Sequence, residues 1–120
     1  MSIDKTLKTK AAVIALASLT ALGACGETAE DPNAVEIVIT LKDHVFVPPI
    51  VEAPANTALK LVIRNQDSSA AEFESHDLDL EKIIQGNQEA TLYASPLKPG
   101  TYEFFDEFNE DTAQGKLVVK

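Results

Sequence analysis

Residues 35–120 are predicted to form one all-β domain, a Greek-key β-sandwich of about seven strands with one short helical segment. Apolar and polar residues alternate in short runs, and turn-forming residues separate these runs at fairly regular intervals. The chain that follows the N-terminal leader has about 95 residues, enough to bury one modest core without disulfide bonds. These observations together favour a single β-sandwich domain.

The first strand is expected at residues 35–41, where apolar side chains fall on alternate positions and Glu36 and Thr40 lie between them. Val38 departs from strict alternation on the outer face. Pro48 and Pro49 follow soon afterwards, and proline has no N–H to donate within a sheet. The segment that contains them is therefore expected at a sheet edge or at a crossing between two sheets.

Further strands are expected where the same alternation returns, at residues 59–64, 72–75, 89–94, 101–106 and 115–119. Polar, turn-forming residues lie between them at 65–69 and at Gly86 and Asn87. Residues 78–84 contain Asp79-Leu80-Glu81-Lys82, which lacks β-branched side chains, so one or two helical turns are expected there.

The N-terminus has the pattern of a lipoprotein signal peptide, assigned to residues 1–24. Three lysines precede an apolar, alanine-rich stretch at 11–22 that is too short to span a bilayer comfortably. Leu22-Gly23-Ala24-Cys25 resembles a bacterial lipobox, which makes Cys25 the expected lipidation site. Residues 25–34 are polar and are expected to form a tether. The predicted location is the periplasm or cell envelope, anchored to the membrane by lipid.

The charge of the domain is strongly negative. The whole chain has a formal charge of −9, and the leader holds three of its ten basic and one of its nineteen acidic residues, which leaves −11 for the remainder. Nucleic-acid binding depends on Lys and Arg that neutralise phosphates, so no nucleic-acid partner is expected. Cations and basic protein surfaces are the favoured partners.

Residues 99–117 resemble the last ligand loop of cupredoxins, in which a Pro-Gly turn starts an aromatic strand that ends in Cys, His and Met ligands. Here Asp106 stands at the Cys position, Asn109 at the His position, and Ala113 or Gln114 at the Met position. A blue-copper site needs a thiolate and two imidazoles. The single cysteine of the chain is Cys25, so no type 1 blue-copper site is expected.

Three segments carry a more specific resemblance: DHVFVP at 43–48, NQDSSAAEFESHDL at 65–78, and LKPGTYEFFDEFNEDTAQGKLVV at 97–119. They resemble the EfeO-type cupredoxin-like proteins, bacterial periplasmic or lipid-anchored domains associated with high-affinity iron permeases. The resemblance implies a cupredoxin-like fold, a bound iron or copper ion, and a membrane iron permease or other envelope protein as partner. Members often carry His where this chain has Asn109.

The candidate metal ligands are mainly carboxylates, namely Glu72, Glu74, Asp106, His44 and Glu107. In an extended segment Glu72, Glu74 and His76 project to one face while Phe73 packs inward. In the cupredoxin-like frame, Glu72 and Asp106 are expected to meet at one end of the sandwich. Carboxylate oxygens favour hard cations such as ferric iron, and an imidazole extends the choice to Fe²⁺, Zn²⁺ and Cu²⁺.

Two other interpretations of these residues stay open. Acidic side chains on loops and strand edges commonly form a solvated face that blocks edge pairing, and both His44 and His76 can be structural. No catalytic motif stands out, so an enzyme is not expected. The preferred function is metal binding through carboxylates, with iron favoured and copper second, as an accessory to iron uptake. The alternative is a metal-free module that docks an envelope partner through its acidic end.

Overall fold

The computed structural model describes residues 30–120, so the expected signal peptide, Cys25 and the first part of the tether lie outside the described residues. The described chain is built of short strands and one turn of 3-10 helix. In order, these are β1 (Val35–Lys42), β2 (Val45–Phe46), β3 (Ile50–Ala53), β4 (Leu59–Asn65), β5 (Ala71–Ser75), β6 (Leu80–Ile84), β7 (Glu89–Ala94), β8 (Gly100–Asp106), η3 (Glu107–Asn109) and β9 (Gln114–Val119). The expectation of an all-β sandwich is confirmed, with nine strands in place of about seven, and the one helical turn of the described residues lies at Glu107–Asn109.

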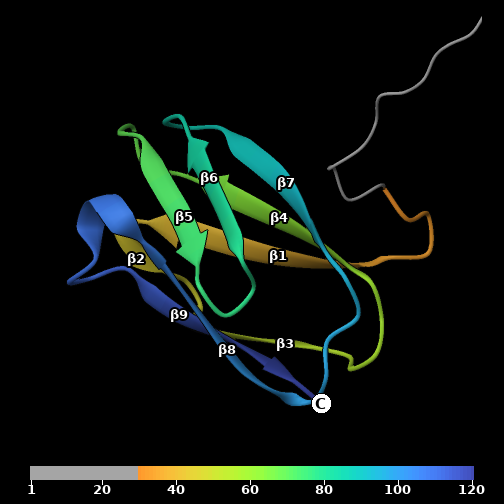
Figure 1. Ribbon diagram of the computed structural model, residues 1–120. Helices are drawn as coiled ribbons and strands as arrows, with labels where there is room; N and C mark the ends of the chain where they lie inside the picture. The colour runs from red at the N-terminus through yellow and green to blue at the C-terminus, as the bar shows by residue number, and fades with distance from the viewer. Residues whose placement is uncertain (1–29) are drawn as a thin grey trace, which may run out of the picture.

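The strands form two sheets that pack face to face (Figure 1). The first sheet has the order β2-β1-β4-β7, and the second has the order β3-β9-β8-β5-β6. Two neighbouring pairs, β1 with β4 and β3 with β9, run parallel, and the other pairs are antiparallel. The second sheet carries the acidic residues of β5 and β6 at one of its edges.

Pro48 and Pro49 lie where the chain passes from one sheet to the other. They separate β2, at the edge of the first sheet, from β3, at the edge of the second. Neither proline has to donate an N–H to a ladder at this point. The expected crossing between the two sheets is confirmed.

The prediction of helical turns at residues 78–84 is wrong. Residues Leu80–Ile84 form strand β6, which pairs with β5 from Ala71↔Ile84 to Ser75↔Leu80. The turn between the two strands is made possible by Asp79, whose φ of 57° is left-handed. The hairpin buries one face of β5 against the core, and this outweighs the weak local preference of residues 78–84.

The core lies between the sheets and is built from alternate positions of the strands. Phe46, Phe73 and Phe104 form its aromatic centre, with ring centroids 4.9 to 6.4 Å apart. Gly115 is required beside them because a Cβ at this position would lie 2.4 Å from the Phe104 ring. This packing fixes which face of β5 and β8 is turned outward.

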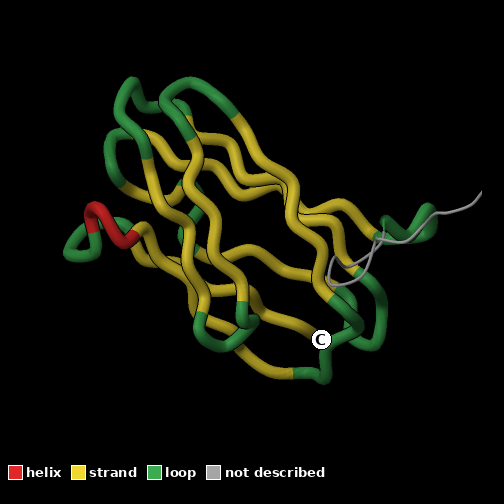
Figure 2. The backbone as a smooth tube through the Cα atoms, turned by 45° about the horizontal axis from the view of Figure 1, so that its top comes forward, coloured by secondary structure: helices red, strands yellow, loops and turns green. Residues whose placement is uncertain are grey.

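The single helical turn, η3, lies at the end of the sandwich opposite the C-terminus (Figure 2). It follows β8 directly and places Glu107 beside β5. Within residues 30–120 the structure contains no helix with the length and apolar character needed to cross a membrane.

Candidate metal centre

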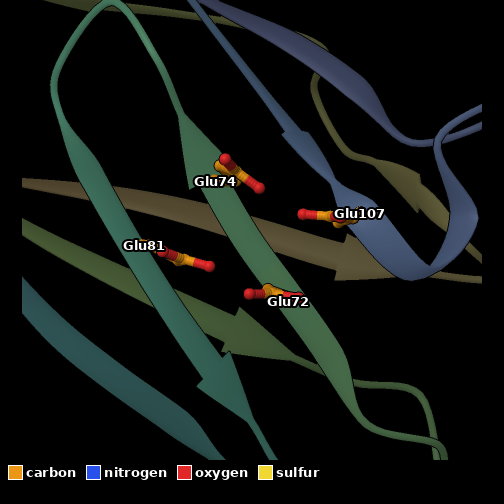
Figure 3. Close-up of side chains that lie close together, drawn as sticks. All are labelled: Glu72, Glu74, Glu81 and Glu107. Atoms are coloured by element: carbon orange, nitrogen blue, oxygen red, sulfur yellow. The ribbon is translucent and has the colours of Figure 1, made fainter.

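Four glutamates lie close together on the outer side of the second sheet. Glu72 and Glu74 come from β5, Glu81 from β6, and Glu107 from the first position of η3 (Figure 3). One carboxylate oxygen of each lies within 4.8 Å of those of the other three. We call these four residues the carboxylate cluster.

The alternation of β5 explains why two of the glutamates face outward. Ala71, Phe73 and Ser75 are buried, so Glu72 and Glu74 project from the opposite face of the strand. Across the hairpin, Glu74 pairs directly with Glu81. Neighbouring side chains on one face of a sheet lie about 5 Å apart, close enough for the carboxylates to interact.

The register between β5 and β8 supplies the fourth glutamate. Phe73 pairs with Asp106, the last residue of β8, and Glu107 follows immediately. The hairpin is also tied to β8 at its turn, because Ser75 Oγ donates to Glu103 O at 2.6 Å and Asp77 Oδ2 accepts from Glu103 N at 2.8 Å. The β5–β6 hairpin and the end of β8 are thus held in one arrangement.

Two carboxyl pairs within the cluster share hydrogen bonds, and the pKa values reflect this. The side-chain hydrogen bond with Glu81, partial burial and the neighbouring negative charges raise the pKa of Glu72 to about 7. A hydrogen bond with Glu107 and another with His76 lower the pKa of Glu74, against the effect of burial. The same hydrogen bond with Glu74, together with nearby glutamate charges, raises the pKa of Glu107. Like charges at this separation are accommodated by a shared proton or by a cation.

His76 contacts one member of the cluster. Its Nε2 lies 2.9 Å from Glu74 Oε2, and its ring meets the Phe105 ring edge-on with centroids 5.5 Å apart. The His76 side chain is 76% exposed, whereas that of Glu74 is 17% exposed. Within residues 30–120, the other three carboxylates of the cluster form no salt bridge with a basic side chain.

Asp106 contacts this region in a different way from the cluster members. Its carboxylate is 1% exposed, and Oδ1 accepts from the main-chain N–H of Glu72 at 2.9 Å and of Phe108 at 3.0 Å. Oδ2 accepts from Asn109 Nδ2 at 3.2 Å. Glu72 and Asp106 are in contact, as expected, but the contact is a hydrogen bond from the Glu72 main-chain N–H to the Asp106 side chain.

The positions that correspond to cupredoxin ligands are occupied by internal contacts. The Asp106 side chain accepts hydrogen bonds from Glu72, Phe108 and Asn109, and its main-chain N–H donates to Ala113 O at 3.0 Å. Ala113 is fully buried. Ala113 N in turn donates to Asn109 O at 2.9 Å. Hydrogen bonds of the chain itself close this loop, and residues 30–120 contain no cysteine.

His44 is separate from the carboxylate cluster. Asp43 and His44 have φ values of 55° and 62° and form a turn between β1 and β2. Asp67 holds the turn, with Oδ1 accepting from Asp43 N at 2.6 Å and Oδ2 from His44 N at 2.9 Å. Burial acts to raise the pKa of Asp67, but these two hydrogen bonds and the nearby His44 and Lys42 lower it overall. His44 Nδ1 lies 3.6 Å from Asp67 Oδ2.

Of the five residues proposed as ligands, the structure brings Glu72, Glu74 and Glu107 together and places Asp106 behind them and His44 elsewhere. It adds Glu81, which the sequence interpretation missed. Residues 80–84, Leu-Glu-Lys-Ile-Ile, do not alternate between apolar and polar side chains, so the sequence held no local signal that Glu81 shares a face with Glu74.

Four oxygen donors from glutamates suit a hard cation. Two of the glutamates are half-buried and two are exposed, so an ion bound here keeps part of its water shell. The donors fit a metal by charge and spacing.

Comparison with known proteins places the chain and its fold in a wider group. The family described as cupredoxin-like domain matches residues 12–119. The uncharacterized protein RP394 of Rickettsia prowazekii (strain Madrid E) is 48% identical over 94 residues, which cover 78% of this chain and 75% of that protein.

Two solved structures show the same fold at low sequence identity. Auracyanin B superposes with a TM-score of 0.67 and 14% identity, covering 79% of this chain and 95% of its own. The metal binding domain of the Cu(I) exporting P-type ATPase CopA of Streptococcus pneumoniae D39 was solved with Cu(I). It superposes with a TM-score of 0.65 and 14% sequence identity, and the match covers 78% of this chain and 93% of that domain.

Proposed function

Because this chain belongs to the cupredoxin-like domain family, we propose that it binds a metal ion through the carboxylate cluster, with iron favoured and copper as the second choice. The observation that carries the proposal is that Glu72, Glu74, Glu81 and Glu107 bring their oxygens within 4.8 Å of one another. Concentrated negative charge of this kind is relieved when a cation binds.

The donor set supports iron over copper. All four candidate ligands are carboxylates, which favour hard ions, and the imidazole of His76 is engaged with Glu74. Copper remains the second choice because auracyanin A, a "blue" copper protein with a TM-score of 0.62 to this chain, and the CopA domain solved with Cu(I) have the same fold. Without a cysteine in the domain, a copper ion bound here would lack a thiolate ligand.

The cellular part of the proposal rests on the sequence. A basic start, a short apolar stretch and a lipobox-like Leu22-Gly23-Ala24-Cys25 support a lipid-anchored protein of the periplasm or cell envelope. The EfeO-type resemblance supports a role as an accessory to iron uptake, with a membrane iron permease as partner. Replacement Cys25→Ser should release the protein from membranes or leave its precursor uncleaved, as fractionation would show. Normal processing with membrane association would contradict the anchor.

Metal binding is tested by calorimetric titration of the full-length chain with Fe²⁺ under anaerobic conditions and with Cu²⁺. Glu74→Gln removes one cluster carboxylate, and we expect at least about tenfold weaker binding. Glu36→Gln removes an exposed carboxylate from β1, in the other sheet, and serves as the matched control, with a change below about twofold. Equal, small effects of the two substitutions would mean that cations are attracted only diffusely.

A second function is favoured by the apolar residues on the elements of the cluster. Ile83, directly opposite Glu72, and Phe108, next to Glu107, are each 51% exposed. Exposed apolar side chains beside strong charge are typical of docking surfaces. If Fe²⁺ and Cu²⁺ fail to bind, docking of a basic envelope protein to this acidic side becomes the better proposal.

A further inference from the structure

Asp106 is a buried carboxylate that no metal-binding step uses directly, although it lies immediately behind the carboxylate cluster. It is 1% exposed, and its recorded side-chain contacts are all with donors of the chain itself. A buried carboxylate is stable only when its charge is met by such donors. The identity of those donors indicates what Asp106 does.

Two of the donors belong to the backbone that carries cluster residues. Asp106 Oδ1 accepts from the N–H of Glu72 itself and from the N–H of Phe108, which follows Glu107. A single oxygen atom therefore joins β5 to the start of η3. These two segments supply Glu72 and Glu107, two of the four side chains that meet in the carboxylate cluster (Figure 3).

The remaining oxygen secures Asp106 in turn. Asn109 Nδ2 donates to Oδ2 at 3.2 Å, and the Asp106 main chain is fixed by its bond to Ala113 O. Beside the strand pairing of Phe73 with Asp106 and of Glu74 with Phe105, this bridge is the side-chain tie between β5 and the end of β8. Groups that orient metal ligands from behind are commonly held in this manner.

We propose that Asp106 is a positioning residue for the carboxylate cluster, setting the separation of Glu72 and Glu107 through Oδ1 without itself binding the metal. This inference rests on the proposed function for its consequence, since the positioned groups are the proposed ligands. Its basis is the hydrogen-bond geometry of a buried side chain.

A conservative substitution of Asp106 distinguishes a positioning residue from a metal ligand. Asparagine keeps Oδ1 as an acceptor for both main-chain N–H groups, whereas alanine removes it. A positioning residue is rescued by Asp106→Asn, while a metal ligand loses its charged oxygen in both variants. We expect Asp106→Asn to bind Fe²⁺ within about twofold of the unsubstituted chain, and Asp106→Ala to bind about tenfold more weakly.

Asp67→Ala is the matched control because Asp67 also accepts two main-chain N–H groups, those of Asp43 and His44, but these do not carry cluster residues. It should reduce stability and leave Fe²⁺ affinity within about twofold. If Asp106→Ala does not fold, Asp106→Ser replaces it, because serine can still cap the N–H of Phe108 but is too short to hold both donors.

A metal-free measurement separates this inference from the proposed function. The carboxyl ¹³C chemical shifts of Glu72 and Glu107, recorded for the full-length chain at one pH, report their mutual contacts. They should move in Asp106→Ala and stay in place in Asp106→Asn and Asp67→Ala. If the unsubstituted chain binds neither Fe²⁺ nor Cu²⁺, the proposed function fails and these shifts still decide the role of Asp106. Equal loss of affinity in the Asn and Ala variants, or unchanged shifts in Asp106→Ala, would overturn the positioning role.

Discussion

Asp106 and the four glutamates of the carboxylate cluster lie on opposite faces of the second sheet, and their surroundings differ. Asp106 faces inward and receives three hydrogen bonds from the chain. Glu72 and Glu81 face outward and are hydrogen-bonded to each other, so that the pKa of Glu72 is raised to about 7. A carboxylate whose donors come from the chain stabilises the fold, whereas carboxylates that face one another favour a proton or a cation.

Among the substitutions considered, removal of the inward-facing carboxylate of Asp106 should have the largest effect on stability. Asp106→Ala leaves two main-chain N–H groups and the Asn109 amide without their acceptor in a buried place, so we expect the free energy of unfolding to fall by about 3 kcal/mol. Urea unfolding at neutral pH measures this. Asp111→Ala, an exposed substitution in the same loop, should change it by less than about 0.5 kcal/mol. Similar values for the two variants would contradict the structural role of Asp106.

Reversal of one charge among the outward-facing glutamates should change both stability and Fe²⁺ affinity. Glu81→Lys places an ammonium opposite Glu74 on the neighbouring strand, where opposite charges stabilise a sheet and like charges do not. In metal-free buffer at about pH 8, the urea midpoint should rise, while Fe²⁺ affinity should fall at least about tenfold. A lower midpoint together with unchanged affinity would mean that the glutamates neither repel one another nor bind the ion.

A smaller effect is expected from pH. Glu72 has an ordinary pKa of 4.5 and a folded-state pKa of about 7, so the folded chain holds more protons than the unfolded chain between these values. The free energy of unfolding should therefore fall as pH rises from about 4.5 to about 7 through this group. Urea midpoints in chelated buffer should show that Glu72→Gln reduces this decline. An identical pH profile in the variant would exclude Glu72 as its source.

Much of the fold could be predicted from alternation alone. The outward direction of Glu72 and Glu74 and the inward direction of Phe73 follow from the period of a strand, and the structure has them so. The same reasoning failed for Glu81, because residues 78–84 lack a strong local preference and only pairing with β5 makes them a strand.

The details of the candidate site depend on contacts that are distant in sequence. Asp106 meets the Glu72 N–H because Phe73 pairs with Asp106 across more than thirty residues, and no local pattern encodes that register. His44 lies in a left-handed turn because Asp67 accepts its N–H, a contact 23 residues away. Such partners are chosen by packing of the whole sandwich, so a sequence pattern identifies the acidic residues but not which of them meet.

The location of the bound ion is the most direct test of the central claim. Substoichiometric Mn²⁺ broadens the NMR signals of nearby amides, and the broadening falls steeply as the distance from the ion increases. If the ion binds at the carboxylate cluster, the amides of Glu72, Glu74, Glu81 and Glu107 broaden first, and those around His44 and Asp111 remain sharp. Broadening centred on His44 or Asp111, or spread evenly over the acidic surface, would contradict a metal site at the carboxylate cluster.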